Sequence, residues 1–404
     1  MNDLNIKIAW SVFFALTIGF FLRFTQIEVL QNLLIPILEI LGQVFILFLK
    51  MIMIPLIFFS LTSSISSLQE NKQSSFLWKG TLIYYFSTMV FAVLLMMIVM
   101  NIYEPGSHSD IQNMTNPLMT EFNHQPNLFM DGIKSIIKNP FEALASGNIM
   151  AIVVFSILFG LALRSDRASI KKVKNWFDGM FDITMIIVNK LMALAPIGIF
   201  ALLSLLIIQQ DLTVFLSLAY FILLVLGVIF FHGVVFLPLI LKTFTQIGIL
   251  NFFSKSKTIL ITAFATSSSA ATLPISISNL ENNFKVDQKV SRFVLPLGAT
   301  VNMDGTALYE AAVALFVANI VGINLGLSDQ IFLVFLAMAA SIGAPAIPSA
   351  GMVTLALVLG ALNLPVEYIA LFIPIDRLID TFRTTVNVEG DLVGALVMNK
   401  FFKA

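Results

Sequence analysis

The chain has 404 residues, of which 58% are hydrophobic and 11% charged, and its 23 lysines and arginines balance its 23 aspartates and glutamates. Soluble domains are roughly 25% charged, so this composition predicts an integral membrane protein. The balanced charge gives no reason to expect nucleic-acid binding, and the lack of cysteine excludes disulfides and cysteine-ligated metals. The histidines show no zinc-ligand spacing, which argues against a metalloenzyme; they are His108, His124 and His232.

Eight apolar stretches are long enough to cross a membrane. A helix needs about 20 apolar residues to span a hydrocarbon core about 30 Å thick. The first stretch lacks a small-residue cleavage site, so we interpret it as a retained span and not as a signal peptide. The predicted fold class is therefore all-α integral membrane, with eight transmembrane helices. The stretches are 6–24, 30–62, 79–103, 148–164, 180–208, 213–241, 290–322 and 366–398.

One basic loop orients the predicted spans. Short basic loops stay in the cytoplasm, so the segment after the fourth span should be cytoplasmic. Both termini then lie inside, and the polar stretch 104–147 lies outside. A sequon at Asn113 in that stretch is attributed to chance, because we predict the inner membrane of a bacterium as the location. The basic residues of the loop are Arg164, Arg167, Lys171, Lys172 and Lys174.

Two further apolar stretches are interrupted and too short to cross. Each arm of the first reaches only about 15 Å at most at 1.5 Å per residue, which is no more than half of the hydrocarbon core. Irregular backbone at membrane depth is tolerated only inside protein or beside a water-filled cavity, so we predict two re-entrant helical hairpins of opposite orientation around an internal site. Surface loops are the alternative. The first has arms 259–265 and 273–277 around 266–272, and the second has arms 331–340 and 352–364 around 341–351.

The last predicted span carries a stripe of charged residues. Such charges cannot face lipid, since even a lenient scale assigns about 2.5–3.5 kcal/mol to each central charge. A carboxylate one turn from a guanidinium suits a zwitterion with a second acid, with Asp380 holding an ammonium and Arg383 a carboxylate. A self-neutralising ion network is the alternative, and Arg377 is given no role. Spacings of 4, 3, 4 and 4 place on one helix face Asp376, Asp380, Arg383, Asn387 and Asp391.

The seventh predicted span is interrupted in its middle, over 298–306. Asn302 and Asp304 offer hard oxygen ligands there. Unwound carbonyl groups beside them would complete a site for a small monovalent cation, as in other discontinuous membrane helices. A plain glycine kink is the alternative interpretation.

Four segments in the last 150 residues resemble the glutamate transporter family, the dicarboxylate/amino acid:cation symporters that include the excitatory amino acid transporters and their prokaryotic relatives. They occur in the family's order and spacing, and the resemblance covers nearly the whole chain. It implies inverted repeats, a homotrimer, a static scaffold (1–75 and 104–208) and a transport domain (76–103 and 209–404) that moves like an elevator. The segments are 267–274, 302–306, 341–348 and 376–391.

The resemblance also implies a substrate site. By the family's pattern, Asp380 takes the substrate amino group and Arg383 its side-chain carboxylate. Relatives that handle neutral amino acids lack this arginine, and relatives that handle dicarboxylates without an amino group lack this acid. L-glutamate and L-aspartate are therefore the expected substrates. Asn387 and Thr384 bind the main-chain end, and the pocket is closed by Thr306, Ser269 and the outer-gate residues Ala346, Ile347 and Gly351.

Cation sites are implied in the same way. Na⁺, with H⁺, is the implied coupling ion, and no organic cofactor is expected. Met89 replaces a hydroxyl residue beside the third sodium site, which weakens the case for that site. The first site comprises Gly298, Asn302, Asn387 and Asp391, the second lies near Thr300, Ser341, Ile342 and Ala344, and the third uses Tyr85, Thr88, Asn302 and Asp304.

Two further positions inform the expected coupling and binding. Glu310 stands where sodium-only archaeal members carry glutamine and proton-coupled animal members carry glutamate. Because burial disfavours the charged form of a carboxyl, we predict that Glu310 loads and unloads a proton; a permanently neutral acid is the alternative. Archaeal members carry an arginine at the position of Ser267 and animal members at that of Thr381. This chain has neither, unless Arg377 substitutes.

The sequence thus predicts a symporter of acidic amino acids driven by Na⁺ and H⁺. The nearest alternatives are purely proton-driven symport and transport of C4-dicarboxylates or neutral amino acids. An intramembrane hydrolase is disfavoured because the hairpin serines have no general base, and because Arg383 would suppress proton sharing between Asp304 and Asp380. A non-transporting sensor or channel is the remaining class.

Overall fold

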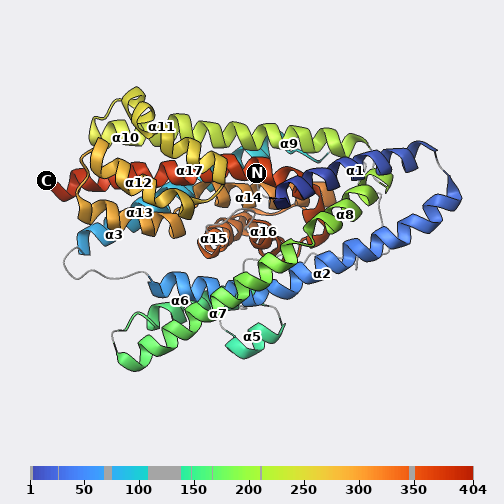
Figure 1. Ribbon diagram of the computed structural model, residues 1–404, viewed down its shortest axis with the longest axis horizontal. Helices are drawn as coiled ribbons and strands as arrows, with labels where there is room; N and C mark the ends of the chain where they lie inside the picture. The colour runs from blue at the N-terminus through green and yellow to red at the C-terminus, as the bar shows by residue number, and fades with distance from the viewer. Residues whose placement is uncertain are drawn as a thin grey trace.

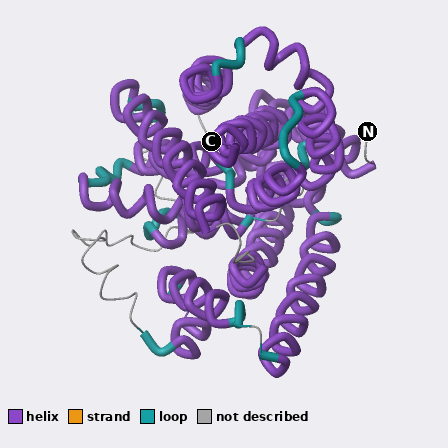
Figure 2. The backbone as a smooth tube through the Cα atoms, turned by 90° about the vertical axis from the view of Figure 1, so that its left-hand side faces the viewer, coloured by secondary structure: helices purple, strands orange, loops and turns teal. Residues whose placement is uncertain are grey.

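The computed structural model describes residues 3–25, 27–67, 75–107, 138–146, 148–165, 167–209, 212–344 and 351–403 (Figure 1). Within these ranges every regular element is a helix and none is a strand (Figure 2). The predicted all-α class is therefore confirmed for this part of the chain.

The helices follow the predicted apolar stretches in chain order. The first half comprises α1 (Asp3–Thr25), α2 (Glu28–Ser67), α3 (Ser75–Tyr103), α5 (Pro140–Ser146), α6 (Ile149–Ala162), α7 (Ala168–Met192) and α8 (Ala195–Gln209). The second half comprises α9 (Leu212–Phe231), the π-helix η2 (His232–Phe236), α10 (Leu237–Thr245), α11 (Ile249–Thr266), α12 (Ser269–Asn283), α13 (Gln288–Val301), α14 (Asp304–Val321), α15 (Leu327–Gly343), α16 (Gly351–Ala361), the short 3-10 helix η3 (Val366–Tyr368) and α17 (Ile369–Lys403).

Each of the eight predicted spans corresponds to one helix or to consecutive helices. The fifth is divided into α7 and α8, the seventh into α13 and α14, and the sixth continues from α9 through η2 into α10. The number of membrane crossings and their orientation stay predictions. Among the described residues, four segments are long and apolar enough to cross a membrane: Glu28–Phe45, Leu77–Tyr103, Leu216–Thr245 and Gln288–Val321.

Polar residues between the apolar stretches cap the helices. At the start of α6 the Asn148 side chain accepts a hydrogen bond from the Ala151 N–H at 3.1 Å. At the start of α13 the Asp287 carboxylate accepts one from the Lys289 N–H at 2.8 Å. These caps satisfy amide groups that have no partner within their own helix. The polar clusters therefore set where the helices begin.

The interruptions are shorter than predicted. Between α11 and α12 only Ser267 and Ser268 leave the helix, with Ser267 in the left-handed region at φ 49°. The Ser268 hydroxyl accepts a hydrogen bond from the Ala271 N–H at 3.2 Å, so the serine-rich segment begins α12. In the seventh span only Asn302 and Met303 separate α13 from α14. The interruption of the second hairpin lies largely outside the described residues.

The two helical arms of the first hairpin are longer than predicted from the sequence. The arms α11 and α12 have 18 and 15 residues, because polar residues continue both helices beyond the apolar stretches. At 1.5 Å per residue α11 is about 27 Å long, and not half of the hydrocarbon core. Two observations support a hairpin here. The chain turns at Ser267, and α11 and α12 contact each other and both contact α17.

The helices pack in two groups. In one group α1 packs on α8, and α2 packs on α6, α7 and α8. In Figure 1, α2, α5, α6 and α7 lie along the lower edge of the view. In the other group α14 contacts α3, α15, α16 and α17, while α17 contacts α10, α11 and α13. In an apolar stretch of 18 residues within Gln288–Val321, 89% of the residues are buried, against 17% in Glu28–Phe45, so α13 and α14 form the interior.

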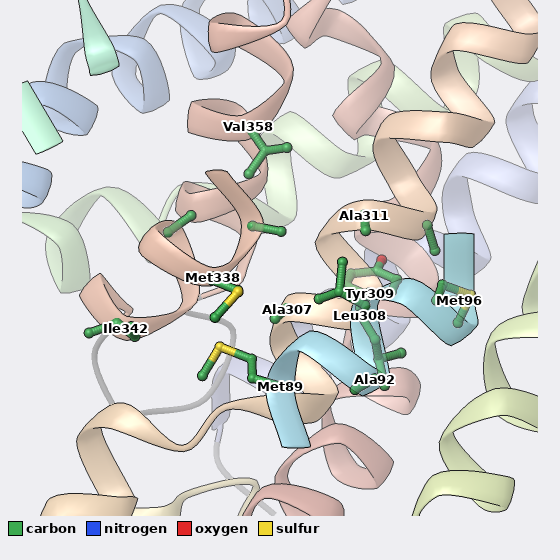
Figure 3. Packing of buried hydrophobic residues seen from close by; sticks show 14 of the residues in the cluster. Met89, Ala92, Met96, Ala307, Leu308, Tyr309, Ala311, Met338, Ile342 and Val358 are labelled. Carbon is green, nitrogen blue, oxygen red and sulfur yellow. The ribbon is translucent and has the colours of Figure 1, made fainter. Parts of the chain in front are cut away.

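Small residues let α3 approach α14 closely. Ala92 of α3 and Ala307 and Ala311 of α14 are fully buried where the two helices meet (Figure 3). Small side chains at helix contacts allow close backbone approach, which is how membrane helices gain packing energy. Met89 fills the space toward α15, with its sulfur 3.6 Å from the Ser341 hydroxyl. The broken segment at the start of α14 is thereby held rigidly between α3 and α17.

Candidate functional site

The charged stripe of α17 lies in the protein interior. The side chain of Arg383 is 1% exposed, and its Nη2 donates to Asp376 Oδ1 at 3.0 Å and to Asp380 Oδ1 at 2.9 Å. The guanidinium carbon lies 4.4 Å from the centre of the Tyr309 ring, a cation–π contact. Arg377 Nη1 lies 3.5 Å from Asp380 Oδ2. The predicted stripe is therefore a connected ion network.

Two donors of the Arg383 guanidinium are not used by this network. Nε and Nη1 are buried and have no hydrogen-bond partner within the described residues. Gly351, at the start of α16, lies against the guanidinium, because a Cβ built at Gly351 would be 2.8 Å from Nη1 and 3.1 Å from Nη2. A buried cation is costly unless acceptors satisfy its donors. A carboxylate oxygen is a suitable acceptor for either donor.

The start of α14 meets α17 at Asn387. The Asn387 Oδ1 accepts a hydrogen bond from the Gly305 N–H at 2.8 Å, and its Nδ2 donates to the Thr306 hydroxyl at 3.3 Å. Thr384 lies buried one turn earlier on α17, and Ser269 lies buried at the start of α12, which contacts α17. The N-terminus of α14 carries partial positive charge. The structure thus brings Thr306 of α14 to Asn387, on the helix that carries Arg383, while Ser269 is placed near them only through the contact of α12 with α17.

A cluster of hard oxygens adjoins this region. Asn302 Nδ2 donates to Asp391 Oδ1 at 2.9 Å and to the Asn387 carbonyl at 3.2 Å. The other side-chain atom of that amide, Asn302 Oδ1, is buried without a hydrogen-bond partner in the described part of the chain. Gly298 lies against the Asp391 carboxylate, because a Cβ at Gly298 would overlap it. The four residues of the predicted first cation site therefore lie together.

The residues of the predicted third site are joined by an unexpected histidine. The Thr88 hydroxyl donates to Asp304 Oδ1 at 3.3 Å, while His232 Nε2 lies at hydrogen-bond distance, 2.9 Å, from Asp304 Oδ2. The Tyr85 hydroxyl donates to the Val294 carbonyl at 3.0 Å. Both Asp304 oxygens therefore already have protein partners.

The predicted second site is only partly described. The Thr300 hydroxyl donates to the Leu297 carbonyl at 3.0 Å, and the Ser341 hydroxyl to the Met338 carbonyl at 2.9 Å. Their helices, α13 and α15, contact each other. Ile342 and Ala344 are buried at the end of α15. The outer-gate residues Ala346 and Ile347 lie outside the described residues.

Two carboxyl groups are buried without ion-pair partners within the described residues. Neither oxygen of Glu310 has a partner of hydrogen-bond geometry, and the Thr354 hydroxyl beside it donates to the Gly351 carbonyl at 3.0 Å. Glu389 on α17 is also buried, and its Oε2 would be 3.1 Å from a Cβ at Gly233 in η2. An uncompensated carboxylate is strongly disfavoured in such surroundings.

Comparison with known proteins identifies the family of this chain. A family model described as the sodium:dicarboxylate symporter family matches residues 4–401. The chain belongs to this family. It is 33% identical to excitatory amino acid transporter 2 of Mus musculus, over 90% of this chain and 73% of the relative. It is 30% identical to the proton/sodium-glutamate symport protein of Geobacillus stearothermophilus, over 98% of this chain and 95% of the relative.

The family match confirms two predictions from the sequence. The resemblance noted in the last 150 residues extends over both helix groups, from α1 to α17. The sodium:dicarboxylate symporters and the relatives named above are transporters, so the chain is a transporter and not an enzyme. The hydrolase interpretation is thereby set aside.

Sequence reasoning missed three side chains in this sodium:dicarboxylate symporter. His232 shows no zinc-ligand spacing and receives no role from the sequence, yet it contacts Asp304. It begins a π-helix, and this π-helix has no clear sequence signal. Tyr309 was not considered, although it lies one helical turn after Thr306 and stacks on Arg383. Glu389 could have been noticed, because it is a further acid two residues from Asn387 in an apolar span.

The close packing of α14 on α17 predicts the effect of one substitution. An alanine methyl at Gly305 would lie 2.7 Å from the Arg383 carbonyl oxygen and 2.8 Å from its Cα, backbone atoms that cannot rotate away. We expect Gly305→Ala to lower the melting temperature of the detergent-solubilised protein, since overpacking costs about 1–3 kcal/mol. Gly227→Ala is the control, because no atom of the described residues lies within 4 Å of a Cβ at that position. Equal melting temperatures of the two variants would contradict this packing.

Proposed function

We propose that this protein is a secondary active symporter that takes up L-aspartate or L-glutamate together with Na⁺ and H⁺. One observation carries the proposal. The Arg383 guanidinium is buried beside Asp380, and its Nε and Nη1 have no partner in the described residues. Such donors suit the second carboxylate of an acidic amino acid, and the neighbouring carboxylate suits its ammonium group.

The surrounding residues extend this assignment to the whole substrate. Arg383 binds the side-chain carboxylate and Asp380 the ammonium group. Asn387 and Thr384 bind the main-chain carboxylate, close to the positive N-terminus of α14. Asn387 is already oriented by Gly305 and Thr306, so little ordering is required when substrate binds. The N-terminal end of α12, at Ser269, completes the described part of the pocket.

Na⁺ enters this scheme as a co-transported substrate. Gly298, Asn302, Asn387 and Asp391 would bind one ion through hard oxygens. Asn302 Oδ1 fits this role, because it has no hydrogen-bond partner in the part of the chain that the structure describes. Asn387 belongs to both sites, so occupancy of one favours the other, and such coupling is reciprocal. Further ions would bind at the second and third predicted sites.

The names of relatives support both the substrate and the ions. The relative from Geobacillus stearothermophilus is named a proton/sodium-glutamate symport protein, and the mouse relative is an excitatory amino acid transporter. Glu310 is the proposed proton carrier, because its carboxyl is buried one turn after Thr306 and has no ion-pair partner among the described residues. Protonation would remove a charge that the apolar surroundings disfavour.

We also propose an elevator mechanism in a homotrimer of the bacterial inner membrane, with both termini in the cytoplasm. The two packing groups support the division, with α3 and α9–α17 as the moving transport domain and α1, α2 and α5–α8 as the scaffold. The sequence resemblance supports the trimer. The basic residues that precede and begin α7 support the orientation.

Symport driven by protons alone is a second candidate. The observation that favours it is that both Asp304 oxygens are paired, one with Thr88 and the other with His232. A third Na⁺ would therefore find fewer available ligand oxygens at Asp304. In that case Asp304 and Asp391 would serve structure or proton transfer. The two candidates differ in the gradient that drives accumulation.

The test is uptake of labelled aspartate into proteoliposomes under an inward Na⁺ gradient, an inward proton gradient, or both. We expect Na⁺-dependent accumulation that an inward proton gradient accelerates. Glu310→Gln, which keeps the shape of the protonated acid, should retain Na⁺-driven uptake and lose the acceleration. Accumulation without Na⁺ would favour the proton-driven candidate, and unchanged acid stimulation in Glu310→Gln would reject Glu310 as the carrier.

A further inference from the structure

Asp380 lies between two arginines of its own helix. Its Oδ1 lies 2.9 Å from Arg383 Nη2, and its Oδ2 lies 3.5 Å from Arg377 Nη1. With Asp376, the four side chains carry two negative and two positive charges. The carboxylate assigned to the substrate ammonium is therefore already paired with a second protein cation.

The two arginines are held very differently. Arg383 is 1% exposed, pairs with two carboxylates and stacks on Tyr309. The side chain of Arg377 is 26% exposed, and its ion pair with Asp380, at 3.5 Å, is longer than a good hydrogen bond. Its Nη1 is buried and makes no hydrogen bond within the described residues. A long side chain at the edge of a site can swing its charged head into water at little cost. Arg377 is thus the cation that can leave Asp380.

We infer that Arg377 is a displaceable counter-ion of Asp380 that competes with the ammonium group of the substrate and so sets the selectivity for amino acids. This inference rests on the proposed function. Without substrate, Arg377 compensates the Asp380 charge. An arriving ammonium must displace Arg377, because Arg383 occupies Oδ1 and the two other cations compete for Oδ2 and repel each other there. Acids that lack an ammonium group need no such displacement. Removal of Arg377 should therefore favour aspartate over succinate.

The test is equilibrium binding to the purified full-length protein in nanodiscs at saturating Na⁺. We expect Arg377→Gln to bind aspartate about tenfold more tightly than the unmodified protein, with succinate affinity unchanged or weaker. Arg377→Lys, with a shorter reach toward Asp380, should shift aspartate affinity in the same direction by a smaller factor. Lys400→Gln removes an exposed charge from the same helix and should change neither affinity.

The possible results separate the inference from the proposed function. Aspartate affinity that is unchanged or weaker in Arg377→Gln and Arg377→Lys would overturn the inference. An equal gain for succinate would do the same, because it would indicate a general effect of charge and not competition for Asp380. If the unmodified protein binds no acidic amino acid, the proposed function fails, and the inference with it. If succinate binds too weakly to measure, the change in aspartate affinity alone tests the inference.

Discussion

Replacement of Arg383 by glutamine is expected to weaken aspartate binding by about 100-fold or more. Truncating one member of a buried charge pair costs about 2–5 kcal/mol, and every 1.4 kcal/mol is a factor of ten in affinity. The variant keeps a hydrogen-bond donor but loses the charge and the planar guanidinium group. Alanine, which has no side-chain carboxylate, should be bound no more weakly than before. Binding at saturating Na⁺ is the measurement.

The control for Arg383→Gln is an arginine outside the site. Arg292 is 61% exposed and pairs with Glu281 at 3.1 Å, and exposed pairs of this kind contribute about 0–1 kcal/mol. Arg292→Gln should therefore leave aspartate affinity within twofold of the unmodified protein. Because Arg383→Gln also leaves Asp376 and Asp380 without their shared partner, its melting temperature must be recorded beside its affinity. A folded Arg383→Gln variant with full aspartate affinity would rule out the proposed substrate site.

Asp391→Asn is expected to raise the Na⁺ concentration needed for half-maximal aspartate binding by about tenfold or more. The amide keeps the shape of the carboxylate but supplies a neutral oxygen, and Na⁺ is bound chiefly by charge and hard oxygen ligands. Asn302, which donates to Asp391 at 2.9 Å, keeps an acceptor in the variant. The measurement is aspartate binding as a function of Na⁺ concentration.

Glu389→Gln provides a matched control on the same helix. Glu389 is a buried acid two residues from Asp391, but its side chain lies against Gly233 of η2. The control should therefore leave the Na⁺ dependence as it is in the unmodified protein. Equal shifts in both variants would mean that the loss of any acid from α17 weakens Na⁺ binding, which would contradict a specific site at Asp391.

The helical periodicity of α17 allowed its charged face to be predicted from sequence. Residues three and four apart share one face, and charges cannot face lipid, so the spacing of the polar residues between Asp376 and Asp391 predicts an interior site. The sequence does not predict which residues these charges pair with. Arg383 pairs with both Asp376 and Asp380, while Arg377 takes the second oxygen of Asp380. Such choices depend on rotamers and on neighbouring helices such as α14.

The ends of broken helices were predicted less well. Serine, threonine and glycine in 266–272 suggested a long interruption, but only Ser267 and Ser268 leave the helix, because Ser268 caps α12. These residues favour helix N-termini as strongly as loops, and composition alone does not separate the two. The His232–Asp304 contact could not be predicted, since the π-helix that precedes α10 shifts the helical register there.

The most direct test is the structure of the protein with L-aspartate and Na⁺ bound. We expect the aspartate side-chain carboxylate to lie within about 3 Å of Arg383 Nε or Nη1. We expect the ammonium group at Asp380, with Arg377 turned away from the Asp380 carboxylate. Aspartate bound elsewhere, or bound with its ammonium group remote from Asp380, would contradict the proposed substrate site.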